Sequence, residues 1–197
     1  MTSEVKITKT TAAQRQIDAA IRVLFSGEDA LAIHTVVAAA HTILVDLDNQ
    51  RTKPVLNGFY STAFKKAIEA FRLPQFDEPE LDRNLPAFKE LIQRVRRKPA
   101  NFLKHANRDP EHALDESALK TEHLLLEACT LYAGLGLKLT PEMYVYVQWH
   151  LAVYPHEESD KIKTELGYVH DLAHDAQLEL GRFLLDKVKG KILVDQL

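Results

Sequence analysis

The chain has 197 residues, of which 46% are hydrophobic and 27% are charged, values typical of a globular protein with a sizeable core. Its formal net charge of −3 argues against nucleic-acid binding over the whole surface, so any such role must come from a local patch. Cys129 is the one cysteine, which excludes an internal disulfide framework and is typical of a reducing cytoplasm. No apolar run reaches the ~18 residues that a membrane span needs, and the N-terminus lacks the apolar core of a signal peptide. We therefore expect a soluble cytoplasmic protein with no membrane partner.

Helical periodicity dominates the sequence. Glycine and proline are few, and the apolar residues recur at three- and four-residue spacings. The pattern predicts a single all-α domain over residues 1–197, an up-and-down helical bundle with a long C-terminal helix.

The first two helices are predicted to form an antiparallel hairpin. Thr11 and Gln14 suggest a capping box that opens the first helix. Its apolar stripe is Ile17, Ile21, Leu24 and Phe25. Ser26 and Gly27 end it, and the stripe of the second helix is Ile33, Val37, Ala40, Leu44 and Leu47. So short a link between two such stripes is typical of a helical hairpin.

The middle of the chain is predicted to contain a loop over 48–58, a helix over 59–71, an acidic connector over 75–82 and a helix over 85–97. The buried face of the last of these is expected to be Phe88, Leu91, Ile92 and Val95. Pro99 disfavours helix at Lys98, so we expect the chain to break there and to restart near Asn101.

Three further helices are predicted, over 117–135, from Thr140-Pro141 to about Tyr154, and over 159–191. The last carries a heptad seam formed by Ile162, Leu166, Val169, Ala173, Ala176, Leu180 and Phe183. Such a seam drives helix pairing, and it predicts a homodimer or a higher homo-oligomer. It also supports an alternative function, that of a non-catalytic interaction or regulatory protein.

Residues 94–110 hold the densest basic charge of the chain. Within them Asn101, Lys104, His105 and Arg108 lie at i, i+3, i+4 and i+7, on one face of a helix. Lys104 and Arg108 would bind a phosphate while His105 exchanges a proton near neutral pH. We therefore predict that the 94–108 surface binds RNA or nucleotide phosphate, with no cofactor required. The alternative is a solvated basic face on which His105 serves packing or capping.

The hairpin over residues 13–47, with its Gly27-Glu28-Asp29 turn and paired alanines, resembles the first hairpin of HEPN domains, the nucleotide-binding helical bundles of higher eukaryotes and prokaryotes. The segments AIHT…AAAH and NFxKHAxRDP also resemble a widespread family of uncharacterised bacterial proteins. The resemblance implies a HEPN-like bundle over 12–135 and leaves 140–193 as a C-terminal helical extension.

Many HEPN domains are metal-independent ribonucleases whose motif is an arginine, four to six residues, then a histidine; others only bind. The resemblance implies that His105 is the catalytic histidine and that Asn101 is the polar residue after the motif arginine. The arginine position itself falls on Ala100, and the nearest upstream arginine is Arg97. Seven residues, including a proline, separate Arg97 from His105, so binding and metal-independent RNA cleavage both stay open.

His170 and His174 form an i, i+4 pair, a spacing that chelates zinc in other proteins and suggests, as a less favoured alternative, a metal-dependent enzyme. His34 and His41 lie about 10.5 Å apart along a helix, too far to share an ion, so we interpret them as hydrogen-bonded residues of a helix seam or as pocket lining. Glu122 and Glu127 lie about 140° apart around their helix, which excludes a di-iron pattern.

Overall fold

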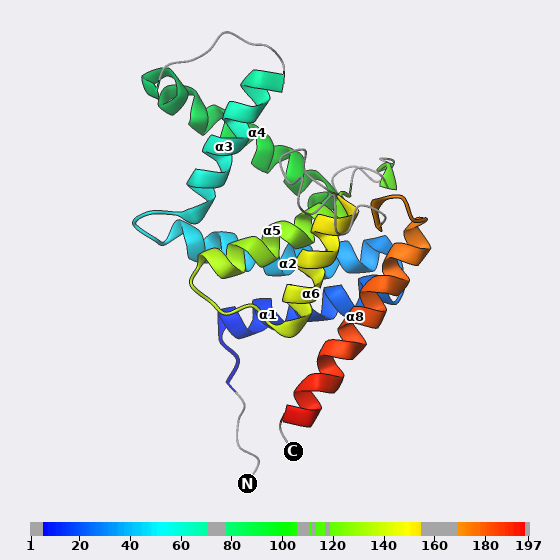
Figure 1. Ribbon diagram of the computed structural model, residues 1–197. Coiled ribbons are helices and arrows are strands. Elements are labelled where there is room, and N and C mark those ends of the chain that lie inside the picture. Colours follow the sequence, from blue (N-terminus) through cyan, green and yellow to red (C-terminus); the bar gives the residue numbers. More distant parts are fainter. Residues whose placement is uncertain are drawn as a thin grey trace. The chain divides into compact units, whose positions relative to one another are not determined.

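The computed structural model describes residues 6–70, 78–105, 111, 113–116, 119–154 and 169–195 (Figure 1). Within these ranges the chain forms α-helices and no strand, which confirms the prediction of an all-α protein. The helices are α1 (Lys9–Phe25), α2 (Ala30–Asn49), α3 (Val55–Ala70), α4 (Glu78–Lys104), α5 (Thr121–Gly134), α6 (Pro141–Val153) and α8 (His174–Asp195).

The chain divides into two compact units. The first unit combines residues 1–44 with residues 119–197, and the second is residues 45–118. The first unit therefore draws helices from both expected parts, 12–135 and 140–193, while the single domain over 1–197 stays a prediction.

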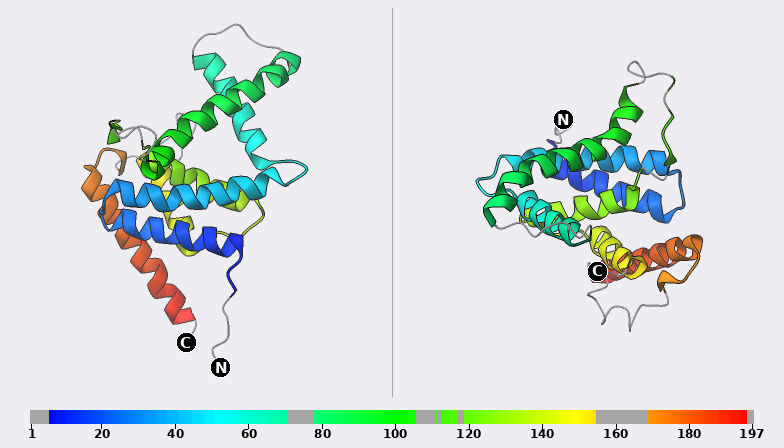
Figure 2. Two further views of the ribbon diagram at one scale, coloured as in Figure 1. Left: turned by 180° about the vertical axis from the view of Figure 1, so that it is seen from behind. Right: turned by 90° about the horizontal axis from the view of Figure 1, so that it is seen from above.

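In the first unit α1 and α2 run antiparallel and side by side, which agrees with the predicted hairpin (Figures 1 and 2). The turn between them uses Gly27 at a φ of 72°, a conformation that suits glycine. Asp29 Oδ1 then accepts the Leu31 N–H at 2.8 Å and so caps α2. The predicted Thr11 cap is wrong, because Thr8 already fills the N-cap and its hydroxyl accepts the Thr11 N–H at 3.1 Å.

The core of the first unit is built around Phe25, the last residue of α1. Its ring lies edge-on to Trp149 of α6, with 5.3 Å between the ring centroids, and 6.3 Å from Tyr146. All three aromatic side chains are buried. Aliphatic residues of four helices complete this core: Ile17, Ile21, Ile33, Val37, Leu44, Leu125, Leu131 and Val145. The predicted stripes of the first two helices are buried here, with Leu47 half-buried.

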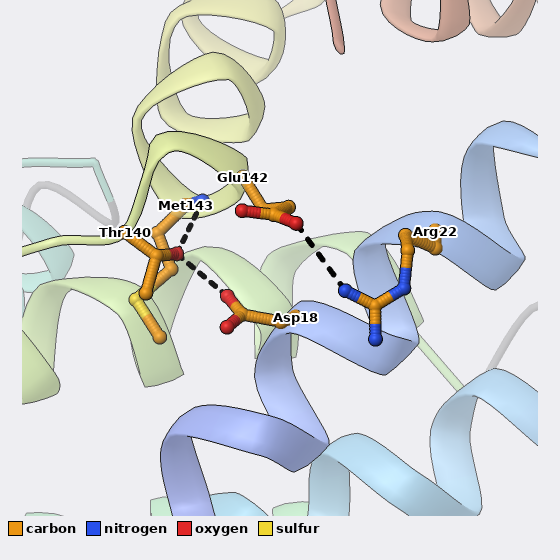
Figure 3. A network of polar contacts seen from close by, with 5 residues as sticks. All are labelled: Asp18, Arg22, Thr140, Glu142 and Met143. Carbon is orange, nitrogen blue, oxygen red and sulfur yellow. Dashed lines mark hydrogen bonds and ion pairs between the residues drawn. The ribbon is translucent and has the colours of Figure 1, made fainter. Parts of the chain in front are cut away.

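The predicted start of α6 is confirmed. Thr140 is the N-cap, and its hydroxyl accepts the Met143 N–H at 3.1 Å while donating to Asp18 Oδ1 of α1 at 2.6 Å (Figure 3). Beside this pair Arg22 and Glu142 form an ion pair at 3.3 Å. Two polar contacts therefore join α1 to the first turn of α6.

The start predicted for α5 at residue 117 is wrong. The helix begins at Thr121, and Lys120 before it has a left-handed φ of 46°, which is incompatible with a continuing right-handed helix. The prediction that Leu125, Ala128, Leu131 and Tyr132 are buried is confirmed, and Leu124 is half-buried.

The long C-terminal helix predicted over 159–191 is also wrong, because residues 171–173 are not helical and α8 begins at His174. Residues 155–168, with two positions of the heptad seam, lie outside the described ranges. The predicted heptad seam also differs from the face of α8 that is buried. Phe183 is 55% exposed, whereas Leu178, Gly181 and Leu185 are buried, because α8 packs on α1 and α6 through the face that contains Gly181.

In the second unit α3 begins at Val55, inside the predicted loop over 48–58. The buried Asp48 carboxylate explains this start, since its two oxygens accept the N–H groups of Val55 at 2.8 Å and Leu56 at 3.0 Å. The carboxylate thereby satisfies donors that the first turn of a helix leaves unpaired.

Helix α4 corrects two predictions. It starts at Glu78, within the expected connector over 75–82, and it runs through Pro86 and Pro99 to Lys104 without the expected break. Pro99 is buried, and we attribute the continuity to its packing, which compensates for the backbone hydrogen bond that proline cannot make. The expected buried face is only partly present: Phe88 and Ile92 are half-buried, while Leu91 and Val95 are exposed.

Helix α2 has the length and composition of a membrane span, with a mean hydropathy of 1.7 over 18 residues, which the sequence analysis did not recognise. A core helix meets the same criteria, so this is weak evidence of a span. In this window 33% of the residues are buried, and Ile33, Val37, Ala40 and Leu44 are among the buried residues of α2 in the first unit.

Candidate polyanion interface and histidine cluster

The unbroken course of α4 gathers basic side chains on one side of the helix. At about 100° per residue, Arg94, Arg97, Lys98, Asn101 and Lys104 fall within an arc of about 120°. All five are exposed, and we term this surface the basic face. Arg94 forms an exposed ion pair with Glu90 at 3.0 Å, one turn earlier on α4.

His105 directly follows Lys104, the last residue of α4, and lies next to the basic face. Its backbone N–H bonds to the Asn101 carbonyl at 3.0 Å, and its side chain is half-buried. Arg97 and His105 are separated by about 12 Å along the axis and about 80° around it, with Asn101 one turn from each. The structure therefore places the predicted residues Arg97, Asn101, Lys104 and His105 along one side of α4 without pairing Arg97 with His105. Arg108 lies outside the described residues.

Lys89 is the one lysine of α4 that is held by contacts within the second unit. Its ammonium donates to Asn57 Oδ1 at 2.9 Å and lies 5.6 Å from the centroid of the Tyr60 ring. Lys89 is therefore a structural residue, whereas the basic face points to solvent.

A second polar group lies in the first unit, where the start of α5, the end of α6 and the start of α8 meet. We term it the histidine cluster: Glu122, His123, His150, Tyr154 and His174. His150 Nε2 and His123 Nδ1 are 3.2 Å apart. The Tyr154 hydroxyl donates to Glu122 Oε2 at 2.7 Å, and His174 Nε2 lies 3.7 Å from Glu122 Oε1.

The rings of the histidine cluster also pack together. The Tyr154 ring centroid is 4.7 Å from that of His150 and 5.1 Å from that of His123. His150 is only 2% exposed, while His123 is exposed. Burial raises the pKa of Tyr154, and its bond to the Glu122 carboxylate acts in the same direction. Tyr154 therefore stays a hydrogen-bond donor to Glu122 at neutral pH.

The structure does not hold His170 and His174 at the helical spacing on which the metal prediction depended. The chain between them is non-helical at residues 171–173, and His170 Nδ1 donates to the Val153 carbonyl at 2.7 Å. In the part of the chain that the structure describes, no three His, Cys, Asp or Glu side chains are arranged to hold a metal ion.

His34 and His41 lie at the seam between α2 and α5. His34 Nδ1 is 3.4 Å from Thr121 Oγ1, and burial lowers the pKa of His34. His41 Nε2 is 3.2 Å from Glu127 Oε1. The His34 contact agrees with the hypothesis of hydrogen-bonded seam residues, whereas the contact of His41 Nε2 with Glu127 is an ion-pair distance without hydrogen-bond geometry.

Sequence analysis considered Glu122 only to exclude a di-iron pattern, and it did not identify His123, His150 or Tyr154 as members of a cluster. The local signal was a His and a Tyr at i, i+4 in the last turn of α6. Nothing in the sequence indicated that this turn meets the first turn of α5, because the contact depends on how α5 and α6 pack.

Comparisons of the chain with protein-family models, with curated proteins and with solved structures find no match. The fold is that of an all-helical protein of about seven helices. One unit carries an exposed basic face, and the other carries a cluster of histidines around a carboxylate.

Proposed function

We propose that the protein binds nucleic acid, or the phosphate groups of nucleotides, through the basic face. The observation that supports this most strongly is the continuity of α4 through Pro99. It aligns Arg94, Arg97, Lys98 and Lys104 over about 15 Å of helix, all exposed to solvent. Cations in such a row neutralise successive phosphates and release counterions, which gives affinity without sequence preference.

The HEPN resemblance extends this proposal to metal-independent RNA cleavage. His105 would accept the proton of the 2′-hydroxyl as its oxygen attacks the adjacent phosphate, the P–O5′ bond would break as the O2′–P bond forms, and the leaving 5′-oxygen would take up a proton, leaving a 2′,3′-cyclic phosphate and a 5′-hydroxyl. Lys104 and Arg108 would bind that phosphate, with Asn101 one turn away from His105. Because Arg97 lies about 12 Å from His105 along the helix, we propose that Arg97 binds a neighbouring phosphate and not the one that is cut. The proposed step uses no cofactor. We place the protein in the cytoplasm because its single cysteine provides no internal disulfide.

The binding proposal is tested by fluorescence anisotropy with labelled single-stranded RNA at low and moderate salt. Affinity should fall steeply with salt, and Lys98→Ala with Lys104→Ala should weaken binding and reduce the salt slope by about 1.4. Lys9→Ala with Lys138→Ala removes the same charge from exposed positions of the first unit and should bind as wild type does. Absence of binding at low salt, or an equal loss in both double variants, would contradict the proposal.

Cleavage is tested separately, with the same RNA in the presence of a chelator. Wild-type protein should cut the RNA, and His105→Ala should bind it without cutting. Cutting that stops when chelator is added would point instead to a metal-dependent enzyme, and His170→Ala and His174→Ala would then be examined.

The second candidate is a non-catalytic interaction protein that assembles through its C-terminal helix. It is favoured by the outward face of α8, where Phe183 is 55% and Leu184 is 36% exposed. Large apolar side chains next to each other on a helix surface are frequent at protein interfaces. The oligomeric state of the protein distinguishes this candidate from a monomeric binder.

A further inference from the structure

Two large aliphatic side chains of α4 are exposed to solvent one turn apart. Leu91 is 52% exposed and Val95 is 56% exposed, although both were expected in the buried face of the helix. Residues at i and i+4 are neighbours on a helix surface, so the two side chains form one continuous apolar row. We term Leu91 and Val95 the apolar row. Exposed apolar side chains that adjoin charged ones are frequent at binding surfaces.

The apolar row lies between the basic face and the side of α4 that packs within the second unit. At about 100° per residue, Leu91 and Val95 are about 20° and about 60° around the helix from Lys98, the last residue of the basic face in that direction. Beyond the row, Pro99 is buried and Ile92 is half-buried, about 40° and about 60° further than Val95. The basic face and the apolar row are therefore adjacent, and together they cover about half of the circumference of α4.

We propose that the apolar row makes this surface selective for unpaired nucleic acid, with bases against Leu91 and Val95 and phosphates on the basic face. The inference rests on the proposed function, because it names the class of nucleic acid that binds to the same surface. An unpaired base exposes its flat apolar faces, whereas in a duplex these faces are stacked on the neighbouring base pairs. A single strand therefore offers an apolar contact beside each phosphate, and a duplex offers the phosphates alone.

The spread of the two surfaces around α4 favours a flexible ligand over a flat or a straight one. The centre of the apolar row is about 100° around the helix from the centre of the basic face. A membrane surface is flat on the scale of one helix, and a duplex is stiff over about 150 base pairs, so each contacts α4 from one side. A flexible single strand can place its phosphates on one side of α4 and its bases on the next. Charge complementarity accounts for the phosphates, and the apolar row accounts for the bases.

The test compares the affinity of the full chain for a labelled single strand and for a duplex of the same sequence, by fluorescence anisotropy at several salt concentrations. Leu91→Gln with Val95→Thr removes the apolar row, keeps side chains of similar size and changes no charge. The ratio of single-strand to duplex affinity should fall about tenfold in this variant, with the salt slope unchanged. Leu31→Gln with Tyr144→Gln is the control, because it replaces exposed apolar residues of the first unit, and it should keep the wild-type ratio.

An unchanged ratio in the variant without the apolar row would overturn the inference and leave binding through the basic face in place. Absence of binding to both ligands at low salt would instead contradict the proposed function, and the inference with it. Vesicles that contain anionic lipid are the third ligand. Vesicle binding that is lost in Leu91→Gln with Val95→Thr, while the ratio stays as in wild type, would assign the apolar row to a membrane surface. Far-ultraviolet circular dichroism checks that each variant keeps its helical content.

Discussion

Gly181 of α8 lies directly against the ring of Phe25 in α1. A Cβ at position 181 would overlap the ring edge of Phe25, the atom Cε1 in particular. The ring cannot move away easily, because it is buried and packs edge-on against Trp149. The Phe25 carbonyl is held as well, since it accepts Arg182 Nε–H at 2.8 Å. Gly181 therefore sets both the separation of α8 from α1 and the face that α8 buries.

Gly181→Ala should destabilise the protein although alanine is the better helix former. The helix propensity gain is about 1 kcal/mol, whereas overpacking a well-filled core costs about 1–3 kcal/mol. We expect a lower urea midpoint for the loss of native Trp149 fluorescence. Gly58→Ala in α3 is the control, because a Cβ there meets nothing within 4 Å, and it should stabilise its unit by about 0.5–1 kcal/mol. Stabilisation by both variants would show that the Phe25 ring adjusts freely.

Asp18 provides a second prediction, on the pH dependence of stability. Burial raises the pKa of Asp18 above 3.8, and the hydrogen bond from Thr140 opposes but does not cancel this effect (Figure 3). The folded state therefore holds this proton to higher pH than the unfolded state does. The stability that protonated Asp18 contributes is present below its unfolded pKa and is lost as pH rises through the folded pKa.

Asp18→Asn removes this titration but keeps an oxygen that accepts the Thr140 hydroxyl. The stability of the variant relative to wild type should therefore improve as pH rises from about 3.5 to about 6. Thermal unfolding at several pH values measures it. Thr140→Ser, which keeps the hydroxyl and the N-cap, should preserve the wild-type profile; a parallel profile for Asp18→Asn would mean that the carboxyl is not the titrating group.

Local signals explain which parts of the fold were predictable. The turn at Gly27 and Asp29 and the start of α6 at Thr140 follow from capping chemistry within a few residues, and both agree with the structure. The face that α8 buries could not be predicted from local signals. It depends on Phe25, which is more than 150 residues away in the sequence. Gly181 looks like a weak point in a helix until its neighbour in space is known.

Two predictions failed at the candidate sites, and in both cases the rules for a single helix did not hold the answer. The rule that proline disfavours helix at the preceding residue fails at Lys98, where α4 continues and Pro99 is buried. The length of the basic face was therefore underestimated, because its residues were expected on two separate helices. The histidine cluster needs the ends of three helices to meet, and spacing along one helix carries no signal of that.

Asp48 gives a prediction for the second unit. Its buried carboxylate accepts two N–H groups at the start of α3, so Asp48→Ala should cost about 1–3 kcal/mol and speed amide exchange at Val55 and Leu56. Asp46→Ala is the matched control, since Asp46 is exposed on the same helix and should change stability by less than about 0.5 kcal/mol. Hydrogen exchange followed by mass spectrometry measures the local effect, and unchanged exchange at Val55 and Leu56 would contradict the capping role.

The exposed face of α8 leads to the last prediction, that the protein is a homodimer or a higher oligomer through Phe183 and Leu184. The heptad seam expected from the sequence is out of phase with the buried face, and these two residues are left at the surface. Lys187 lies 5.1 Å from the centroid of the Phe183 ring and covers part of it, which leaves the remaining ring area for a partner. Burying two such side chains at roughly 25 cal/mol per Å² supplies a few kcal/mol, enough to contribute to pairing.

Sedimentation velocity at micromolar concentration measures the association. Wild-type protein should exceed the mass of a single chain of 22.3 kDa, and Phe183→Glu with Leu184→Glu should give that mass with helicity kept. Tyr144→Glu is the control, because Tyr144 is as exposed as Phe183 but lies on α6, and it should leave the oligomer intact. A wild-type protein that sediments as a monomer would end the proposal of assembly through α8; an oligomer that the double variant leaves intact would place the interface elsewhere.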